Sequence, residues 1–313
     1  MTIAGPPTAN AENDISLTEE LWMEDEPTEQ EETERRNRIA ALLKNNPRPA
    51  SHSAVAKTFE NNAGKHWDRF YQRNGNRFFK DRHYLGSEFP VLKEAGTVFI
   101  ECGCGVGNAI LPLLDCNPSI TVIGGDFAKT AVETMRRDER YCAAQSESVC
   151  EGRVGRAFSE VWDITVSPFP GEFRTPSGES KPFGSEFADA ASLIFCLSAI
   201  PPQKHERAIR HVASCIKAGG QLLFRDYAEN DDAQLNLLPG CLKETGRVIT
   251  DRTLVKQDGT ICHYFAGEAE VRGLFEAAGF QVQSLQLIKR QYQNRADGTV
   301  RRRRWLTGVF TKR

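Results

Sequence analysis

The segment Glu101-Cys102-Gly103-Cys104-Gly105-Val106-Gly107-Asn108 decides the fold class of this chain. It follows residues 97–100, an apolar run typical of a buried strand, and precedes the apolar start of a helix at residues 109–114. A glycine-rich turn in that place lets the backbone approach a ligand and points helix N–H groups toward it. The alternatives are a tight turn with no ligand, or a nicotinamide or flavin site instead of an S-adenosylmethionine (SAM) site.

Two acids further along the chain narrow the choice of ligand. Asp126 follows a second strand pattern at residues 120–124, where a carboxylate can accept both ribose hydroxyls of a nucleoside. Asp163 follows a third strand pattern, where a carboxylate can bind an adenine amino group. Either acid alone could instead cap a helix or begin a turn. A nicotinamide enzyme would also need a hydride-acceptor site with its own acid, and no such constellation stands out, so the pattern favours SAM.

Strand and helix patterns alternate from residue 97 onward. A fully apolar strand is expected at residues 191–197, an amphipathic helix at 203–216, a strand at 221–225 and a helix at 268–278. Two long strand patterns, 281–291 and 302–310, flank the turn Asp297-Gly298. The alternation predicts a Rossmann-like, doubly wound α/β fold with seven strands, mostly parallel, and an antiparallel terminal hairpin. Residues 168–187, rich in Gly, Pro and Ser, resemble an inserted loop.

The composition excludes several classes of protein. The 313 residues are 40% hydrophobic and 26% charged, as in ordinary globular proteins, and no apolar run is long enough for a transmembrane helix. The acidic N-terminus lacks the apolar centre of a signal peptide. The nine cysteines include no C-x-x-C pair, so neither a metal site nor a disulfide framework is expected. A cytoplasmic or nuclear protein with reduced thiols fits these features, and membrane partners do not.

Charge is unevenly distributed along the chain. Residues 1–50 hold eleven acids and five bases; residues 1–16 should be disordered and residues 17–44 partly helical. Residues 57–82 hold seven bases against three acids, and residues 289–313 hold nine against one. Basic clusters with interleaved aromatic residues are typical of nucleic-acid interfaces, although a solvated surface is the alternative.

A dense aromatic and basic block, Phe78-Phe79-Lys80-Asp81-Arg82-His83-Tyr84-Leu85, precedes the first strand. Such a segment can fold back over the cofactor as a lid, with aromatic rings stacked on a base and cations on phosphate or on the methionyl carboxylate. The alternative is that the aromatic rings are core and the bases are exposed. The preceding residues 54–77 predict an amphipathic helix or helix pair, in which Trp67, Phe70 and Tyr71 are expected to pack.

Several blocks together resemble a known family. His66-Trp67-Asp68-Arg69-Phe70-Tyr71, the 78–85 block, Leu193-Ile194-Phe195-Cys196-Leu197-Ser198-Ala199-Ile200 and Leu223-Phe224-Arg225-Asp226-Tyr227 closely resemble the tRNA N(3)-methylcytidine methyltransferases. The resemblance covers roughly residues 57–313. It implies SAM as the cofactor and methylation of cytidine 32 in the anticodon loop of serine or threonine tRNAs. For some members it also implies a protein partner such as seryl-tRNA synthetase.

The chain departs from that family in places that bear on tRNA identity. Asn236-Leu237-Leu238-Pro239-Gly240 stands where the family usually has an Arg-Phe-Lys-Lys-Gly type run. Pro201-Pro202 and the segment 251–255 also differ from the usual pattern. The tRNA that is recognised therefore stays open, and the run Arg301-Arg302-Arg303-Arg304 could replace the lost charge.

The chemistry implied by the resemblance needs no general base, because cytosine N3 has no proton at neutral pH. Positioning and a carboxylate beside the cationic product should supply the acceleration. Asp226 is the first candidate for that carboxylate and Asp81 the second, with Ser198 lining the channel; alternatively Asp226 pairs with Arg225 or Arg82. The expected cofactor contacts are Glu101, Gly103, Gly105, Gly107, Asn108, Asp126, Phe127, Asp163, Ile164, Leu197, Lys80, Arg82 and His83. The expected RNA contacts are Arg77, Phe78, Phe79, Lys80, Arg225, Lys289, Arg290, Arg302 and Arg304.

These expectations divide the chain into three parts. Residues 1–50 form an acidic, largely disordered or partly helical extension, residues 51–95 a helical segment for RNA binding and lid closure, and residues 96–313 the methyltransferase domain. Two rival interpretations remain: a methyltransferase of proteins or small molecules that shares only the fold, and a non-catalytic tRNA-binding partner subunit.

Overall fold

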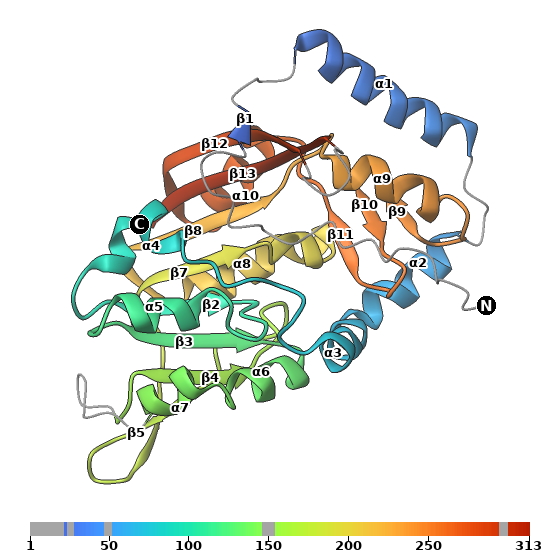
Figure 1. The fold of residues 1–313 in the computed structure, drawn as a ribbon. Helices are drawn as coiled ribbons and strands as arrows, with labels where there is room; N and C mark the ends of the chain where they lie inside the picture. The colour runs from blue at the N-terminus through green and yellow to red at the C-terminus, as the bar shows by residue number, and fades with distance from the viewer. Residues whose placement is uncertain (1–21, 24–27, 47–51, 146–153, 294–299) are drawn as a thin grey trace.

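A central sheet of eight strands organises the molecule, and the computed structural model describes residues 22–23, 28–46, 52–145, 154–293 and 300–313. The strands follow the order β1 (Trp22–Met23), β12 (Phe280–Gln293), β13 (Val300–Lys312), β8 (Ile216–Tyr227), β7 (Ala188–Ile194), β2 (Val98–Cys102), β3 (Thr121–Asp126) and β4 (Ala157–Val161) (Figure 1). The strands from β8 to β4 are parallel, and β13 is antiparallel to both β8 and β12. The predicted seven-stranded sheet with an antiparallel terminal hairpin is confirmed, and β1 adds a short strand at its edge.

Helices cover both faces of the sheet, which explains why its central strands are apolar throughout. In β2, Phe99 belongs to a buried cluster with residues of α5 (Ile110–Cys116) and α7 (Glu139–Gln145). Its neighbours Val98 and Ile100 belong to the cluster of α8 (His205–Ala213) and α10 (Glu268–Ala277) on the other face. Successive strand residues point to opposite faces, and both faces are buried under helices. Polar functional groups therefore lie mainly at the strand ends.

A smaller layer, which we did not predict from the sequence, is inserted between β8 and α10. It consists of α9 (Asp232–Cys241) and a three-stranded antiparallel sheet of β9 (Val248–Thr250), β10 (Thr253–Val255) and β11 (Ile261–His263). Its strands are only three residues long, too short for a clear period-2 pattern.

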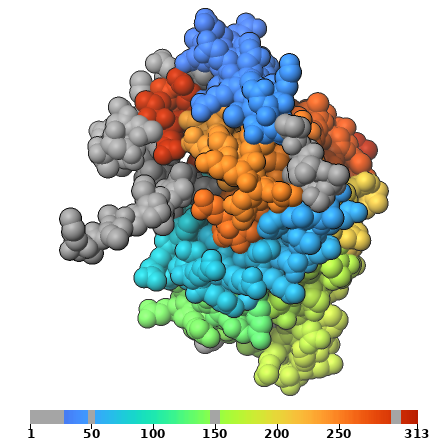
Figure 2. Space-filling model, turned by 90° about the vertical axis from the view of Figure 1, so that its right-hand side faces the viewer, coloured from blue at the N-terminus to red at the C-terminus, as the bar shows by residue number. Residues whose placement is uncertain are grey.

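The N-terminal helix α1 (Glu29–Asn45) rests on this layer. Thr28 and Glu31 begin it with a reciprocal capping box. Ile39, Leu42 and Leu43 pack against the cluster of α9 and β9–β11, and Figure 2 shows the blue surface of α1 seated on the orange surface of the inserted layer. The partial helix predicted over residues 17–44 is present from Glu29 onward, but Trp22–Met23 form the strand β1, so that part of the prediction was wrong. The prediction of disorder at residues 1–16 lies outside the described residues.

The helix pair expected at residues 54–77 is present as α2 (His52–Asn61) and α3 (Ala63–Asn74). The aromatic and basic block then leads through α4 (Leu85–Glu88) and a 3₁₀ turn, η2 (Pro90–Lys93), to β2. Helix α6 (Lys129–Met135) follows β3 and contacts α3.

The segment 168–187 is not a simple loop, and that prediction was wrong. It forms a hairpin of β5 (Glu172–Arg174) and β6 (Ser180–Pro182). Phe169, Phe173, Phe183 and Phe187 form a ring cluster beneath it, with neighbouring centroids 5.0–5.8 Å apart. The packing of these phenylalanines orders the segment as a hairpin even though Gly, Pro and Ser are frequent around them. Among the described helices, none combines the length and apolar character needed to cross a membrane.

Candidate active site

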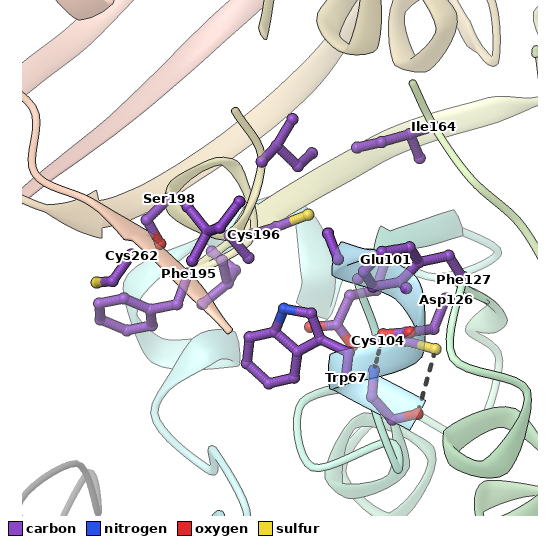
Figure 3. A pocket seen from close by; sticks show the side chains of 18 of the residues that line it. Trp67, Glu101, Cys104, Asp126, Phe127, Ile164, Phe195, Cys196, Ser198 and Cys262 are labelled. Atoms are coloured by element: carbon purple, nitrogen blue, oxygen red, sulfur yellow. Dashed lines mark hydrogen bonds between the residues drawn. The ribbon is translucent and has the colours of Figure 1, made fainter. Parts of the chain in front are cut away.

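A cavity of about 400 Å³ opens at the carboxyl ends of the parallel strands, where open α/β sheets bind their ligands. Its wall takes residues from the ends of β2, β3, β7 and β8, from the segment after β4, and from α3. Figure 3 shows Glu101, Asp126 and Phe127 at one end, Phe195, Ser198 and Cys262 at the other, and the Trp67 ring between them. The cavity is therefore elongated, with a glycine-turn end and a second end beside β8 and β11.

The glycine turn leaves no room for side chains. Gly103 has φ +73° and Gly105 has φ +53°, backbone conformations that favour glycine. A Cβ at Gly103 would lie 2.7 Å from Cys196 Sγ, and one at Gly105 would lie 2.5 Å from Tyr71 Oη. Gly107, by contrast, lies off the cavity wall against Leu111. Two of the three glycines thus shape the cavity, and the third allows α5 to pack.

The carboxylate of Asp126 holds the glycine turn while facing the cavity. Its Oδ2 accepts the Gly105 N–H at 2.9 Å, and its Oδ1 accepts the Ala128 N–H at 2.8 Å at the start of α6. Burial raises its pKa to about 6. Asp163 Oδ1 accepts the Thr165 N–H at 2.8 Å. Both acids thus make the local turn contacts considered as alternatives, and both also line the cavity.

Glu101 carries a buried polar atom on the cavity wall whose hydrogen-bonding capacity is not met. It is 3% exposed, and its Oε2 has no hydrogen-bond partner in the described structure. Burial raises its pKa to about 8, against the opposing attraction of the Arg82 guanidinium. A buried carboxyl oxygen without a partner is costly, so this atom points to a donor supplied by a ligand.

We expect Glu101→Gln to raise the melting temperature of the cofactor-free protein at pH 9 and to change it much less at pH 5. The glutamate pKa is about 8 in the folded chain, compared with 4.5 without burial. Its contribution to stability is therefore fully present below pH 4.5 and is lost as the pH rises through 8. Glutamine removes this dependence. Calorimetric melting at both pH values tests the sign, and an equal change at both would contradict it.

Two residues of α3, which the sequence predicts only as helix-packing residues, also line the cavity. Trp67 and Tyr71 lie four residues apart on one face of the helix, where they pack around Phe70 and also face the glycine turn. Trp67 Nε1 is buried without a partner in the described residues. The i, i+4 aromatic spacing within the 66–71 block was the available signal.

Replacing Trp67 with alanine removes a large aromatic side chain from the cavity wall. It should weaken the binding of SAM, the ligand expected from the sequence, by about 10- to 100-fold, equivalent to 1.4–2.7 kcal/mol. Trp67→Phe is the matched control, since it keeps a ring but removes the orphan N–H. We expect it to retain most of the affinity in calorimetry. Equal losses in both variants would assign the effect to the N–H instead.

The aromatic and basic block is tethered to the glycine turn by Asn108. The Asn108 side chain donates to Phe79 O at 3.2 Å and to Asp81 Oδ1 at 3.1 Å, and Arg82 N donates to Asn108 O at 2.7 Å. Lys80 and Arg82 line the cavity, and the Arg82 guanidinium lies 5.1 Å from the centre of the Phe195 ring. The block therefore lies over the cavity entrance as a fixed segment.

Other residues of this block point elsewhere. Asp81 pairs with Arg140 at 2.8 Å and is not on the cavity wall, and His83 is exposed. Phe78 packs edge-on against Phe70, with centroids 4.8 Å apart, and Arg77 is exposed. Of the thirteen expected cofactor contacts, the ten on the wall are Glu101, Gly103, Gly105, Asn108, Asp126, Phe127, Asp163, Ile164, Lys80 and Arg82; Gly107, Leu197 and His83 are not.

Asp226 lies behind the cavity wall rather than on it. It is fully buried, and its carboxylate accepts the N–H groups of Ser198 and Tyr227, each at 2.9 Å. Ser198 belongs to the 3₁₀ turn η3 (Leu197–Ala199), which lines the cavity. His205 holds the same turn from the other side, with Nε2 2.8 Å from Leu197 O and 2.9 Å from Ile200 O. Burial raises the pKa of Asp226 to about 6.

Aromatic and cationic groups dominate the second end of the cavity. The rings of Phe195 and Tyr227 lie 4.7 Å apart, and the Arg225 guanidinium lies 5.4 Å from the ring centre of Trp305. Arg225 pairs with Glu88, and Arg303 pairs with Asp231 at 3.0 Å. Asp226 was expected, as an alternative, to pair with Arg225 or Arg82. In the described residues Arg225 pairs with Glu88 instead, and the Arg82 charge acts on Asp226 through space. This end offers flat apolar faces framed by positive charge.

Comparisons with known proteins identify the family. Residues 61–285 match a family described as a methyltransferase domain. The tRNA N(3)-methylcytidine methyltransferase of Drosophila melanogaster is 36% identical over 265 residues, covering 81% of this chain and 73% of that protein. That of Schizosaccharomyces pombe is 33% identical over 258 residues, covering 81% and 94%. The chain belongs to the tRNA N(3)-methylcytidine methyltransferase family.

Solved structures confirm the fold of this N(3)-methylcytidine methyltransferase family member. A SAM-dependent methyltransferase of Methanosarcina mazei matches with a TM-score of 0.50 and 18% identity, covering 70% of this chain and 93% of the other. One from Anabaena variabilis matches with a TM-score of 0.52 and 14% identity, covering 80% and 96%. The predicted Rossmann-like methyltransferase fold is thereby confirmed.

The glycine-turn end of the cavity fits SAM, the cofactor of this methyltransferase fold. Glycine at positions 103 and 105 leaves their backbone bare on the cavity wall, with Cys196 and Tyr71 packed where side chains would otherwise stand. The unpartnered Oε2 of Glu101 and the Arg82 guanidinium match the ammonium and carboxylate of a methionyl group. Asp126 and Asp163 place two further carboxylates on the same cavity wall.

In this methyltransferase, the basic hairpin β12–β13 faces the acidic helix α1. Lys289 pairs with Glu32 at 2.6 Å, Arg304 with Glu32 at 2.8 Å and Arg302 with Glu31 at 2.7 Å. Arg304 is 7% exposed, whereas Arg290 is exposed. Three of the four RNA contacts expected on this hairpin are thus engaged by carboxylates of α1. They can contact RNA only if phosphates replace Glu31 and Glu32.

Proposed function

We propose that this protein transfers the methyl group of SAM to N3 of cytidine 32 in the anticodon loop of a serine or threonine tRNA. Family membership supports the reaction, and the yeast relative named tRNA(Thr) (cytosine(32)-N(3))-methyltransferase, from Saccharomyces cerevisiae, is 31% identical over 264 residues, covering 81% of this chain and 38% of that protein. The observation that carries the proposal is the aromatic, cationic end of the cavity, which adjoins the glycine-turn end. A single base can lie there beside the cofactor.

The residues of the chain supply positioning rather than proton transfer. SAM, when bound, supplies a methyl group on a positively charged sulfur. The N3 lone pair of cytosine is free at neutral pH, so no side chain needs to remove a proton before attack. The rings of Phe195 and Tyr227 offer faces on which a splayed base can stack, and the turn η3 closes the wall between the two ends. Alignment of the two reactants then provides most of the rate acceleration.

We infer that Asp226 is a positioning residue in this reaction. It touches the cavity through the Ser198 N–H, and its negative charge lies behind η3, where the methylated base becomes cationic. Asp81 is not on the cavity wall, and its carboxylate is engaged by Arg140 and Asn108. We therefore assign it to anchoring the 78–85 block and assign the electrostatic role to Asp226.

Recognition of the tRNA requires surface contacts beyond the cavity. Arg77, Phe79 and Lys80 lie at or beside the cavity entrance and are proposed to contact the anticodon loop. We also propose a protein partner such as seryl-tRNA synthetase. It would select the tRNA if contacts with the anticodon loop alone do not discriminate between serine and threonine tRNAs.

The proposal is tested by incubating the protein with serine and threonine tRNAs, each with and without its cognate synthetase, and mapping the modified nucleotide. N(3)-methylcytidine at position 32 of at least one tRNA is expected. Stimulation by only one synthetase would identify both the tRNA and the partner. Methylation of proteins or small molecules without modified tRNA would support the rival substrate class.

A further inference from the structure

A second cavity, of about 180 Å³, lies on another face of α3. His66, Arg69, Phe70 and Arg73 line it from the helix, at the spacing of a single helical stripe. Arg247 and the turn 257–259, between β10 and β11, line it from across. Trp67 and Tyr71 of the same helix face the active-site cavity. Different faces of α3 therefore line the two cavities.

The second cavity has a surplus of positive charge. Among the described residues, neither Arg69 nor Arg73 forms an ion pair, and like charges four residues apart weaken a helix. Arg247 pairs with Glu244 at 2.6 Å, and Asp258 Oδ1 accepts the N–H and hydroxyl of Thr260. The wall of this cavity thus holds three arginines and one carboxylate, that of Asp258, while Glu244 pairs with Arg247 from outside the wall. Arg69 and Arg73 are exposed, so water alone could solvate each of them. Their convergence with Arg247 on the wall of one cavity favours an anion as their common partner.

His66 adds a group that responds to an anion. Its ring packs against Phe59, with centroids 5.9 Å apart, and is partly buried. Burial and the nearby charges of Arg69 and Arg247 lower its pKa, while a main-chain contact with Asp258 and the charge of that residue act in the other direction. An anion in the cavity would favour the protonated ring. The imidazole therefore serves as a reporter of binding.

The position of the cavity indicates which anion it takes. Lys65 from α3 and Lys256 from the β10–β11 segment line the active-site cavity, next in sequence to His66 and Gln257 of the second one. The two cavities are thus lined by the same two elements. We propose that the second cavity binds a backbone phosphate of the RNA whose base enters the active site. This inference rests on the proposed function for the identity of the ligand.

The first test compares Arg69→Gln/Arg73→Gln with a matched control, Arg207→Gln/Arg272→Gln, whose arginines are exposed on α8 and α10. Affinity for an anticodon stem-loop is measured by fluorescence anisotropy over a range of salt concentrations. Loss of one phosphate contact should reduce the salt slope by about 0.7–0.9. We expect that reduction, and about tenfold weaker binding at physiological salt, only in the first variant. Equal slopes in wild type and both variants would overturn the proposal.

The second test uses no RNA and so separates this inference from the proposed function. The His66 ring is titrated by proton NMR with and without inorganic phosphate, with His66→Asn to assign its signal. Phosphate should raise the His66 pKa in wild type and leave it unchanged in Arg69→Gln/Arg73→Gln. No response in wild type would overturn the anion site. A response in a protein that neither binds nor methylates tRNA would keep the anion site but reject both its RNA ligand and the proposed function.

Discussion

Gly105→Arg is expected to lose SAM binding by at least about 100-fold, equivalent to 2.7 kcal/mol, and to lose methylation with it. Gly105 has φ +53°, and even a Cβ at this position would lie 2.5 Å from Tyr71 Oη. An arginine side chain must therefore displace Tyr71 or occupy the cavity itself. The Gly105 N–H also holds the Asp126 carboxylate, so the acceptor proposed for the ribose would move with it.

Titration calorimetry with SAM measures this loss, and two variants separate its causes. Gly105→Ala adds only the Cβ and should still weaken binding by about tenfold, or 1.4 kcal/mol. Gly178→Ala is the control, because Gly178 has φ +86° with no heavy atom within 4 Å of the added Cβ. It carries the same backbone strain away from the cavity and should bind SAM normally. Retained SAM binding in a folded Gly105→Arg protein would refute the assignment of the cofactor site.

Asp226→Asn is expected to lower turnover by about 100-fold, the size seen when a preorganised electrostatic group is removed, while SAM affinity changes by no more than a few-fold. The buried carboxylate accepts two N–H groups, and an amide would either offer one of them a donor or lose one contact. It would also remove the negative charge behind η3. Asp226 is not on the cavity wall, so the cofactor contacts stay in place.

The pH dependence of turnover provides a second readout for Asp226. Burial raises its pKa to about 6, so the wild-type carboxylate becomes neutral as the pH falls through that value. Asp126 on the cavity wall titrates in the same range, so the rates are compared at saturating SAM. Under that condition the single-turnover rate should fall more steeply below pH 6 in wild type than in Asp226→Asn. Asp115→Asn, at an exposed acid, is the control. A near-normal single-turnover rate in Asp226→Asn would remove this residue from the mechanism.

The parts of the structure predicted from sequence are those encoded by local patterns. The glycine turn, the apolar strands and the acids at their carboxyl ends follow from periodicity and spacing, because neighbouring parallel strands end at the same edge of a sheet. Asp126 and Asp163 were placed correctly at the cavity for this reason. Asn108 was expected to touch the cofactor, and the structure shows that it also ties the 78–85 block to the turn.

The parts that were missed depend on contacts between distant segments. Trp67 and Tyr71 serve both the helix core and the cavity, and their sequence spacing alone shows only the first role. The inserted layer of α9 and β9–β11 has its own buried cluster, and α1, about 200 residues earlier in the chain, packs against it. The ion pairs of the β12–β13 hairpin with Glu31 and Glu32 likewise join the two ends of the sequence. The basic composition of residues 289–313 predicted a charged surface on this hairpin, but it did not show that the acidic helix α1 pairs with that surface.

The central claim is that the cavity methylates N3 of an unpaired cytidine in tRNA. The most direct measurement incubates serine and threonine tRNAs, each with and without its cognate synthetase, with methyl-labelled SAM and the wild-type protein. The labelled nucleoside and its position are then identified by mass spectrometry. The account predicts label in N(3)-methylcytidine at position 32, and none with Gly105→Arg. Label in another nucleoside, or none in any tRNA despite normal SAM binding, would contradict it.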